Sequence, residues 1–152
     1  MKPSTMTAEE MTALTRLHAE LEQAGTSQYE PLLETVADDP IYEFHPPGGQ
    51  LIGLETIRSF YEEFLANFMP LVEDTILLGE WATGEACVHE YQLRLRVDGK
   101  LEDHQLMGVI YGSGDRIGGE RLYGSPRLMD FMLGSFKEKL VPIEGISRWA
   151  KS

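Results

Sequence analysis

The sequence predicts an α+β fold in which three N-terminal helices cover one face of an antiparallel sheet. Apolar residues recur at helical spacing as far as Phe68, and after Pro70 the pattern changes to that of strands. The expected strands cover about residues 71–79, 85–97, 100–111 and 116–124. Asp98-Gly99 lies between the second and third of them and is typical of a two-residue hairpin turn. Helices that precede such a meander must pack on one of its faces.

The N-terminal half alternates helix signals with breakers. Residues 1–6 are expected to be loose, and Thr7 and Glu10 then form a capping box that begins the first helix. Gly25 ends this helix. A second helix is expected at about 28–37, with Pro31 in its first turn, and a third at about 54–68. The remaining expected elements are a strand at 41–44, a loop at 45–49, a helical piece at about 126–137 and a tail to residue 152.

The hairpin turn fixes which residues of the two central strands share a face. If Val97 pairs with Lys100, then Leu93 lies opposite His104 and Tyr91 lies opposite Leu106. Side chains alternate between faces along a strand. The more apolar face, which we expect to point inward, carries His89, Tyr91, Leu93, Leu95, Glu102, His104 and Leu106.

Composition and charge limit the classes of function. The 152 residues suffice for a single domain, with a core at about 7–137 and peripheral residues at 1–6 and 138–152. A formal net charge of −12 argues against nucleic acid and membrane surfaces as partners. The single cysteine, Cys87, permits no intrachain disulfide. With no secretory leader pattern or long apolar run, a cytoplasmic location is expected.

Several short motifs, taken in order, resemble one superfamily of small α+β proteins. The similarity covers about residues 11–135 and is to nuclear transport factor 2-like (NTF2-like) proteins, which include SnoaL-like polyketide cyclases, ketosteroid isomerases and limonene epoxide hydrolases. The motifs that carry it are Ala37-Asp38-Asp39, Gly53-Leu54-Glu55-Thr56-Ile57-Arg58-Ser59-Phe60-Tyr61, Gly108-Val109-Ile110-Tyr111, Asp115-Arg116-Ile117 and Glu120-Arg121-Leu122-Tyr123.

The resemblance implies a cystatin-like, cone-shaped sheet that curves around the helices and encloses one deep, mostly apolar cavity. It also implies a homodimer through the outer face of the sheet. Fold alone does not imply an activity, because many chemistries and many simple binders share one architecture.

The catalytic positions of the similar enzymes are not preserved here. The tyrosine acid of ketosteroid isomerases aligns with His18, and their aspartate base aligns with Phe44. The Arg and two Asp residues of limonene epoxide hydrolases align with Tyr91, Leu93 and Leu122, although their water-holding tyrosine is matched by Tyr42. Any activity therefore needs a different set of residues, and the histidines are the candidates.

Three residues are the candidate catalytic groups. His104 lies at the centre of the inward face and suits a general acid/base, since an imidazole titrates near neutral pH. The alternative is a buried neutral histidine held by a tyrosine or a carbonyl. His18 faces the cavity if the isomerase alignment holds, and is otherwise a half-exposed helix residue. Tyr91 is suited to stabilising an oxyanion, or it only packs at the cavity rim.

The other predicted cavity residues are expected to contact a ligand; they are Tyr42, Phe44, His45, His89, Leu93, Leu106 and Leu122. The four histidines follow no metal-binding spacing, so we expect neither a metal nor another cofactor.

Two functions of different class fit these observations. The first is a cofactor-independent acid/base isomerase, cyclase or dehydratase that acts on a small apolar carbonyl compound. The second is a non-catalytic module of the same fold that binds a hydrophobic ligand or serves assembly. Convergence of His18, Tyr91 and His104 on one enclosed void would favour the first.

Overall fold

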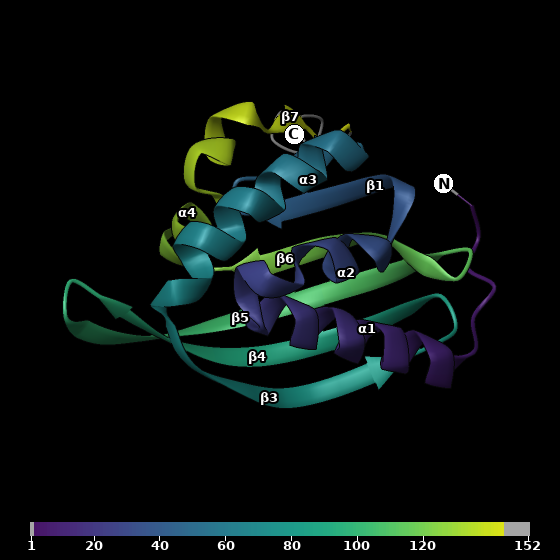
Figure 1. The fold of residues 1–152 in the computed structure, drawn as a ribbon, viewed down its shortest axis with the longest axis horizontal. Coiled ribbons are helices and arrows are strands. Elements are labelled where there is room, and N and C mark those ends of the chain that lie inside the picture. The colour runs from purple at the N-terminus through teal and green to yellow at the C-terminus, as the bar shows by residue number, and fades with distance from the viewer. Residues whose placement is uncertain (1, 145–152) are drawn as a thin grey trace, which may run out of the picture.

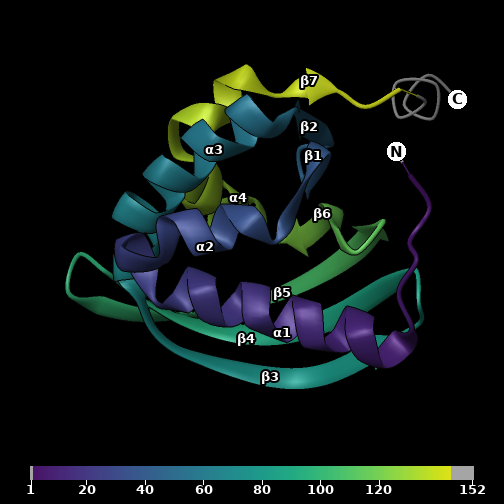
Figure 2. The ribbon, with the colours of Figure 1, turned by 45° about the vertical axis from the view of Figure 1, so that its right-hand side comes forward.

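A strongly curved seven-stranded sheet holds the helices on its concave side (Figures 1 and 2). The computed structural model describes residues 2–144. The helices are α1 (Ala8–Gln23), α2 (Tyr29–Glu34), α3 (Leu54–Glu63) and α4 (Pro126–Leu133), with short turns η1 (Gly25–Gln28), η2 (Phe64–Phe68), η3 (Met69–Leu71) and η4 (Gly134–Lys139). The strands are β1 (Val36–His45), β2 (Gly49–Ile52), β3 (Val72–Ala82), β4 (Ala86–Val97), β5 (Lys100–Ser113), β6 (Arg116–Gly124) and β7 (Val141–Pro142).

The strand order is β3-β4-β5-β6-β1-β2-β7. Neighbouring strands are antiparallel except for β1 and β6, which run parallel. The prediction of an α+β fold is thus confirmed. The prediction of an antiparallel sheet is wrong for one pair of strands, β1 and β6. The parallel pair joins β1, which follows the helices α1 and α2, to β6, which the chain reaches only after the β3–β4–β5 meander.

The predicted hairpin register is confirmed. Val97 pairs with Lys100 and Leu93 pairs with His104, while Asp98 and Gly99 adopt φ angles of 51° and 78°. Both turn residues are therefore left-handed, as a type I′ turn requires. The turn projects beyond the helices (Figure 1), and this position decides the surroundings of His104.

Local signals set the helix ends. Thr7 accepts a hydrogen bond from the amide of Glu10, whose carboxylate accepts one from the amide of Thr7, so the capping box is present. The third predicted helix runs as α3 and continues through the π-helical turn η2. Ser125 caps α4, with Pro126 at its first position.

Several boundary predictions need correction. The second helix, expected at about 28–37, ends at Glu34, and the strand expected at 41–44 begins at Val36 and ends at His45. The segment expected to be loose is held from residue 3 onward, since the amide of Thr5 donates to the carbonyl of Gly114 at 2.9 Å. The loop expected at 45–49 gives way to β2 from Gly49, which pairs with β1. The region expected to be peripheral includes β7, which pairs with β2 at the sheet edge. Residues 145–152 of the predicted tail lie outside the described part of the chain.

The main hydrophobic core lies between the concave face of the sheet and the helices. Phe60, Phe64 and Phe68 stack in sequence along α3 and η2, because four-residue spacing places them on one side of the helix. This aromatic row packs toward the inward residues Leu93 and Leu106 in the same core cluster. Within residues 2–144, no helix is long and apolar enough to cross a membrane.

Candidate functional site

A cavity of about 100 Å³ opens between α1, the aromatic row and the concave face of strands β3 to β6. Its walls are mainly apolar side chains of the aromatic row and of the central strands. Gln23 is exposed and Met69, Val72 and Thr75 are half-buried, so the opening lies at this rim. The lining residues that carry polar side chains are Thr15, His18, Glu22, Gln23, Tyr61, Thr75, His89, Tyr91 and Glu120.

His18 is buried, with 1% of its surface exposed, and its ring orientation is fixed by a hydrogen bond to Thr35. Its Nδ1 lies 2.7 Å from Thr35 Oγ1, and the Thr35 hydroxyl donates to the carbonyl of Leu32 at 2.6 Å. The single hydroxyl proton of Thr35 is thereby used, so Nδ1 of His18 must carry a proton and donate to Thr35. The other ring nitrogen, Nε2, is left for the cavity side.

Three polar groups surround Nε2 of His18. Tyr61 Oη lies at 2.9 Å, Glu120 Oε1 at 3.0 Å and Glu22 Oε1 at 3.2 Å. Glu22 comes from the same helix, one turn further on, and Glu120 comes from β6. The side chain of Glu120 is 7% exposed and that of Glu22 is 21% exposed. Two carboxyl groups therefore share one imidazole in an apolar cavity, and we call these three residues the acid cluster.

The surroundings change how the acid cluster holds protons. Burial lowers the pKa of His18, but attraction to Glu22 and the hydrogen bond to Glu120 outweigh it, and the net pKa is raised. Burial raises the pKa of Glu22, helped by repulsion from Glu120 and opposed by attraction to His18. A carboxyl group whose pKa is raised in this way can take up and release a proton near neutral pH.

Tyr61 and Tyr42 form a second layer of hydroxyl groups behind the acid cluster. Their hydroxyl oxygens lie 2.9 Å apart, and both residues are 1% exposed. Burial raises the pKa of both phenols well above the usual value, so both stay protonated as hydrogen-bond donors. Tyr61 lines the cavity, whereas Tyr42 is one hydrogen bond behind it.

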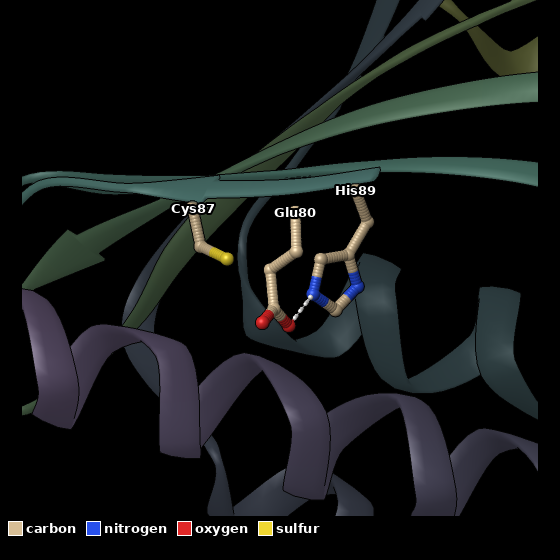
Figure 3. A group of neighbouring side chains, drawn as sticks. All are labelled: Glu80, Cys87 and His89. Atoms are coloured by element: carbon tan, nitrogen blue, oxygen red, sulfur yellow. Dashed lines mark hydrogen bonds and ion pairs between the residues drawn. The ribbon is translucent and has the colours of Figure 1, made fainter. Parts of the chain in front are cut away.

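A second polar network reaches the cavity from the surface. The exposed Arg16 guanidinium binds both carboxylate oxygens of Glu80, and Glu80 Oε2 lies 2.8 Å from Nε2 of His89. Figure 3 shows this last contact. Nδ1 of His89 then lies 2.7 Å from the hydroxyl of Tyr91, which lines the cavity. The hydrogen bonds from Arg16 and His89 lower the pKa of Glu80, so its carboxylate stays ionised.

Among residues 2–144, two groups of side chains are close enough to hold a metal ion. Ligand atoms of the acid cluster lie within 4.8 Å of one another, and so do those of Glu80, Cys87 and His89 (Figure 3). In the second group Arg16 already occupies both oxygens of Glu80, and burial raises the pKa of the Cys87 thiol. A metal ion would have to compete with the Arg16 guanidinium for Glu80, and a protonated thiol is a poor metal ligand, so both features disfavour a metal there. Sequence spacing alone does not reveal either complete group, because each draws its members from two different elements.

The structure brings together six of the predicted site residues on the cavity wall: His18, His89, Tyr91, Leu93, Leu106 and Leu122. His18 is buried rather than half-exposed. Tyr42 and Phe44 are buried behind the wall, and Phe44 packs against Phe60 with ring centroids 5.6 Å apart. His45 stacks on the exposed ring of Tyr123 with ring centroids 4.9 Å apart, and neither residue lines the cavity.

His104 does not join the other candidates in the cavity. Its Nε2 lies 2.9 Å from Glu102 Oε1, and its Nδ1 lies 3.4 Å from the hydroxyl of Ser125. Arg127 also binds Glu102 and, with His104, lowers the pKa of that carboxyl to about 2. The face predicted for His104 is right, but the hairpin carries it toward the start of α4. The predicted convergence of His18, Tyr91 and His104 on one void is therefore wrong for His104.

The sequence contained signals for the residues that were missed. Glu22 lies four residues after His18, which places the two on one face of a helix. Glu120 lies two residues before Leu122 on the same strand, so the two share a face. Tyr61 stands at the end of the quoted Gly53-to-Tyr61 motif. Only the fold shows that these side chains meet at one imidazole.

Comparisons with known proteins agree with this architecture. No model of a known protein family matches the chain, and no curated protein matches its sequence. An NTF2-like protein from Anabaena variabilis is 17% identical with a TM-score of 0.65, covering 76% of this chain and 90% of that one. A protein from Jannaschia described as a SnoaL-like polyketide cyclase is 15% identical with a TM-score of 0.67, covering 88% and 98%.

A de novo designed protein with a curved sheet is equally similar, at 14% identity and a TM-score of 0.68, covering 88% of this chain and 99% of that one. These likenesses show that the chain has the NTF2-like fold. A protein without natural ancestry shares this fold, so the fold assigns no activity and the site must carry the functional argument.

Proposed function

We propose that the protein catalyses proton transfer on a small, mostly apolar carbonyl compound bound in the cavity, as a cofactor-independent isomerase, cyclase or dehydratase. The observation that carries this proposal is the acid cluster. It places two carboxyl groups 3.0 and 3.2 Å from one imidazole nitrogen on the wall of an otherwise apolar cavity. Such convergence of titratable groups in a pocket is a feature of catalytic sites.

The residues have distinct roles in this proposal. Glu22, nearest to the opening, takes a proton from carbon in its ionised form and then returns it, and its raised pKa makes this carboxylate a stronger base. His18, fixed by Thr35, holds the cluster together and balances the charge of Glu120. The hydroxyl of Tyr61, supported by Tyr42, donates to the carbonyl oxygen as negative charge develops there. The apolar walls exclude water and strengthen each of these interactions.

Exchange of carbon-bound protons tests this proposal without knowledge of the natural substrate. Cyclopentanone in D₂O loses its α-protons to solvent, and proton NMR measures the rate. We expect the protein to accelerate this exchange above the buffer rate. Replacement of a general acid/base typically costs about 10²–10⁴-fold in rate, so Glu22→Gln should lose at least about a hundredfold. Tyr61→Phe should also slow the exchange, because it removes the proposed oxyanion donor.

Glu90→Gln is the matched control, since Glu90 lies on the outer face of β4 and the substitution removes the same charge. It should leave the exchange rate unchanged. Exchange no faster than in buffer would refute the proposed catalysis, and equal accelerated rates for the Glu22→Gln variant and wild type would refute the role given to Glu22. Ligand binding without exchange would instead support the alternative, a non-catalytic binding module. A cytoplasmic location also stays a prediction.

A further inference from the structure

We infer that the molecule bound in this cavity carries a basic amine, which binds as an ammonium ion against the carboxyl groups of Glu22 and Glu120. This inference rests on the proposed function, because it names the class of substrate for the same site: a small carbonyl compound that also bears an amino group. It is drawn from two separate features, the charge of the cavity and the direction of the hydrogen bond made by Tyr91.

The first feature is an excess of one carboxyl group. The cavity wall contains two glutamates and, among the described residues that line it, no lysine or arginine. His18 can balance one carboxylate as an imidazolium ion, and the second has no cation. Arg16, the cation of the second network, is bound to both oxygens of Glu80. Without a ligand the excess carboxyl group stays protonated. A bound monocation supplies the missing charge.

This balance also excludes other ligands. An anionic ligand would meet two carboxyl groups and no lysine or arginine on the wall, so it would be repelled. The formal net charge of −12 acts in the same direction over the whole molecule, because it draws cations toward the surface.

The second feature is the orientation of the Tyr91 hydroxyl. The ionised carboxylate of Glu80 can only accept, so Nε2 of His89 must donate to it. In the neutral ring, Nδ1 then has a free lone pair and accepts the proton of the Tyr91 hydroxyl at 2.7 Å. The remaining lone pairs of the Tyr91 oxygen can only accept. This cavity residue therefore recognises a donor such as an N–H group.

The walls suit the apolar part of such an amine. Phe60, Phe64, Phe68, Tyr61 and Tyr91 line the cavity. Aromatic faces attract ammonium ions and also pack against hydrocarbon. A cavity of roughly 150 Å³ is known to hold benzene, so about 100 Å³ with an open rim suits a five-membered ring or a branched chain.

Three ligands of one shape test the inference. Cyclopentylamine is an ammonium ion at pH 7, cyclopentanol is a neutral donor and cyclopentanone only accepts. Dissociation constants are measured for each by ligand-observed NMR titration at 0.15 M salt, which screens surface attraction. We expect cyclopentylamine to bind at least about tenfold tighter than either neutral ligand, since opposite charges attract strongly in a partly buried site. Equal or weaker binding of the amine would overturn the inference.

Variants then locate the bound ion. Glu22→Gln should weaken cyclopentylamine at least about fivefold and leave cyclopentanone within twofold, because only the amine needs the carboxylate. Tyr91→Phe should weaken cyclopentylamine and cyclopentanol more than cyclopentanone. Glu90→Gln on the outer face removes the same charge and should change none of the three. If Glu90→Gln and Glu22→Gln weaken the amine equally, the attraction is diffuse and the inference fails.

The outcomes for the two proposals are separable. Selective amine binding without proton exchange would uphold the inference and refute the proposed catalysis. Proton exchange of cyclopentanone without amine selectivity would do the reverse. Where both hold, cyclopentylamine should inhibit the exchange of cyclopentanone competitively.

Discussion

Replacement of Glu22 by glutamine should stabilise the protein at pH 7 and do so much less at pH 5. The carboxyl of Glu22 has a raised pKa because it is buried beside Glu120. A group whose pKa is raised on folding stabilises the fold fully below its unfolded pKa, and that contribution is lost as the pH rises through the folded pKa. Glutamine keeps the shape of the protonated carboxyl and does not titrate.

The size of this effect follows from proton linkage. One proton retained by the folded state and lost by the unfolded state lowers the free energy of unfolding by about 1.4 kcal/mol per pH unit. The unfolded carboxyl is already largely ionised at pH 5. From pH 5 to pH 7 the advantage of the Glu22→Gln variant should therefore grow by about 2 kcal/mol, with the residual exposure of Glu22 favouring a lower figure. Such a change raises the Tm by roughly 4–8 °C in a domain of this size.

The measurement is urea unfolding of wild type and variant at several pH values between 5 and 7. Glu90→Gln is the control, and its effect should not vary with pH in this way. The raised pKa of His18 has the same sign, so its own contribution is lost as the pH rises further, above about 6.5. A variant that is destabilised at pH 7, or whose advantage is equal at both ends of the range, would refute the description of the acid cluster.

Three further outcomes are expected. His104→Ala should keep more than a tenth of the wild-type exchange rate, since His104 lies outside the cavity; a loss of about 10²-fold would restore it as the general acid/base. Leu32→Ala should cost about 2–5 kcal/mol in urea unfolding, because Leu32 is fully buried, whereas Leu17→Ala at an exposed position should stay within about 0.5 kcal/mol. We also propose a homodimer through the outer sheet face, where Met107 and Trp81 are exposed; light scattering should report twice the monomer mass, and a monomer at micromolar concentration would contradict it.

Local rules were sufficient for the fold and for the faces of the strands. A capping box, a helical stripe and an Asp-Gly turn each depend on neighbouring residues, so the sequence predicts them well. The parallel contact between β1 and β6 joins segments about 80 residues apart, and no local pattern predicts it. The short strands β2 and β7 have few residues from which to read a period.

The candidate site was predicted less well, and His104 shows why. Strand parity states the side of the sheet on which a residue lies, but not how far along the sheet the helices extend. His104 and Tyr91 share the inward face, yet Tyr91 lies beneath α1 and η2, and His104 meets Glu102 and Ser125. The alternation of side chains along the strand gives the correct face for both residues. Only the packing of the helices shows that Tyr91 lies in the cavity and His104 outside it.

The position of the carboxyl groups explains why the sequence analysis did not name Glu120 as a site residue. Where the similar enzymes have acids, this chain has Phe44, Leu93 and Leu122, and the sequence therefore directed attention to histidines. The acid on β6 is present, but it stands at position 120. A shift of two residues keeps the side chain on the same face and moves it about 7 Å along the strand.

That shift is sufficient to bring Glu120 to Nε2 of His18 at 3.0 Å. Leu122, two residues further along β6, is buried on the same cavity wall and cannot make this contact from its position. Moving the acid back should therefore fail. The double variant Glu120→Leu with Leu122→Glu restores the composition of the wall but leaves His18 without its strand carboxylate. Exchange activity that survived this swap would show that the cavity needs only an acid on its wall, and that the contact with His18 is incidental.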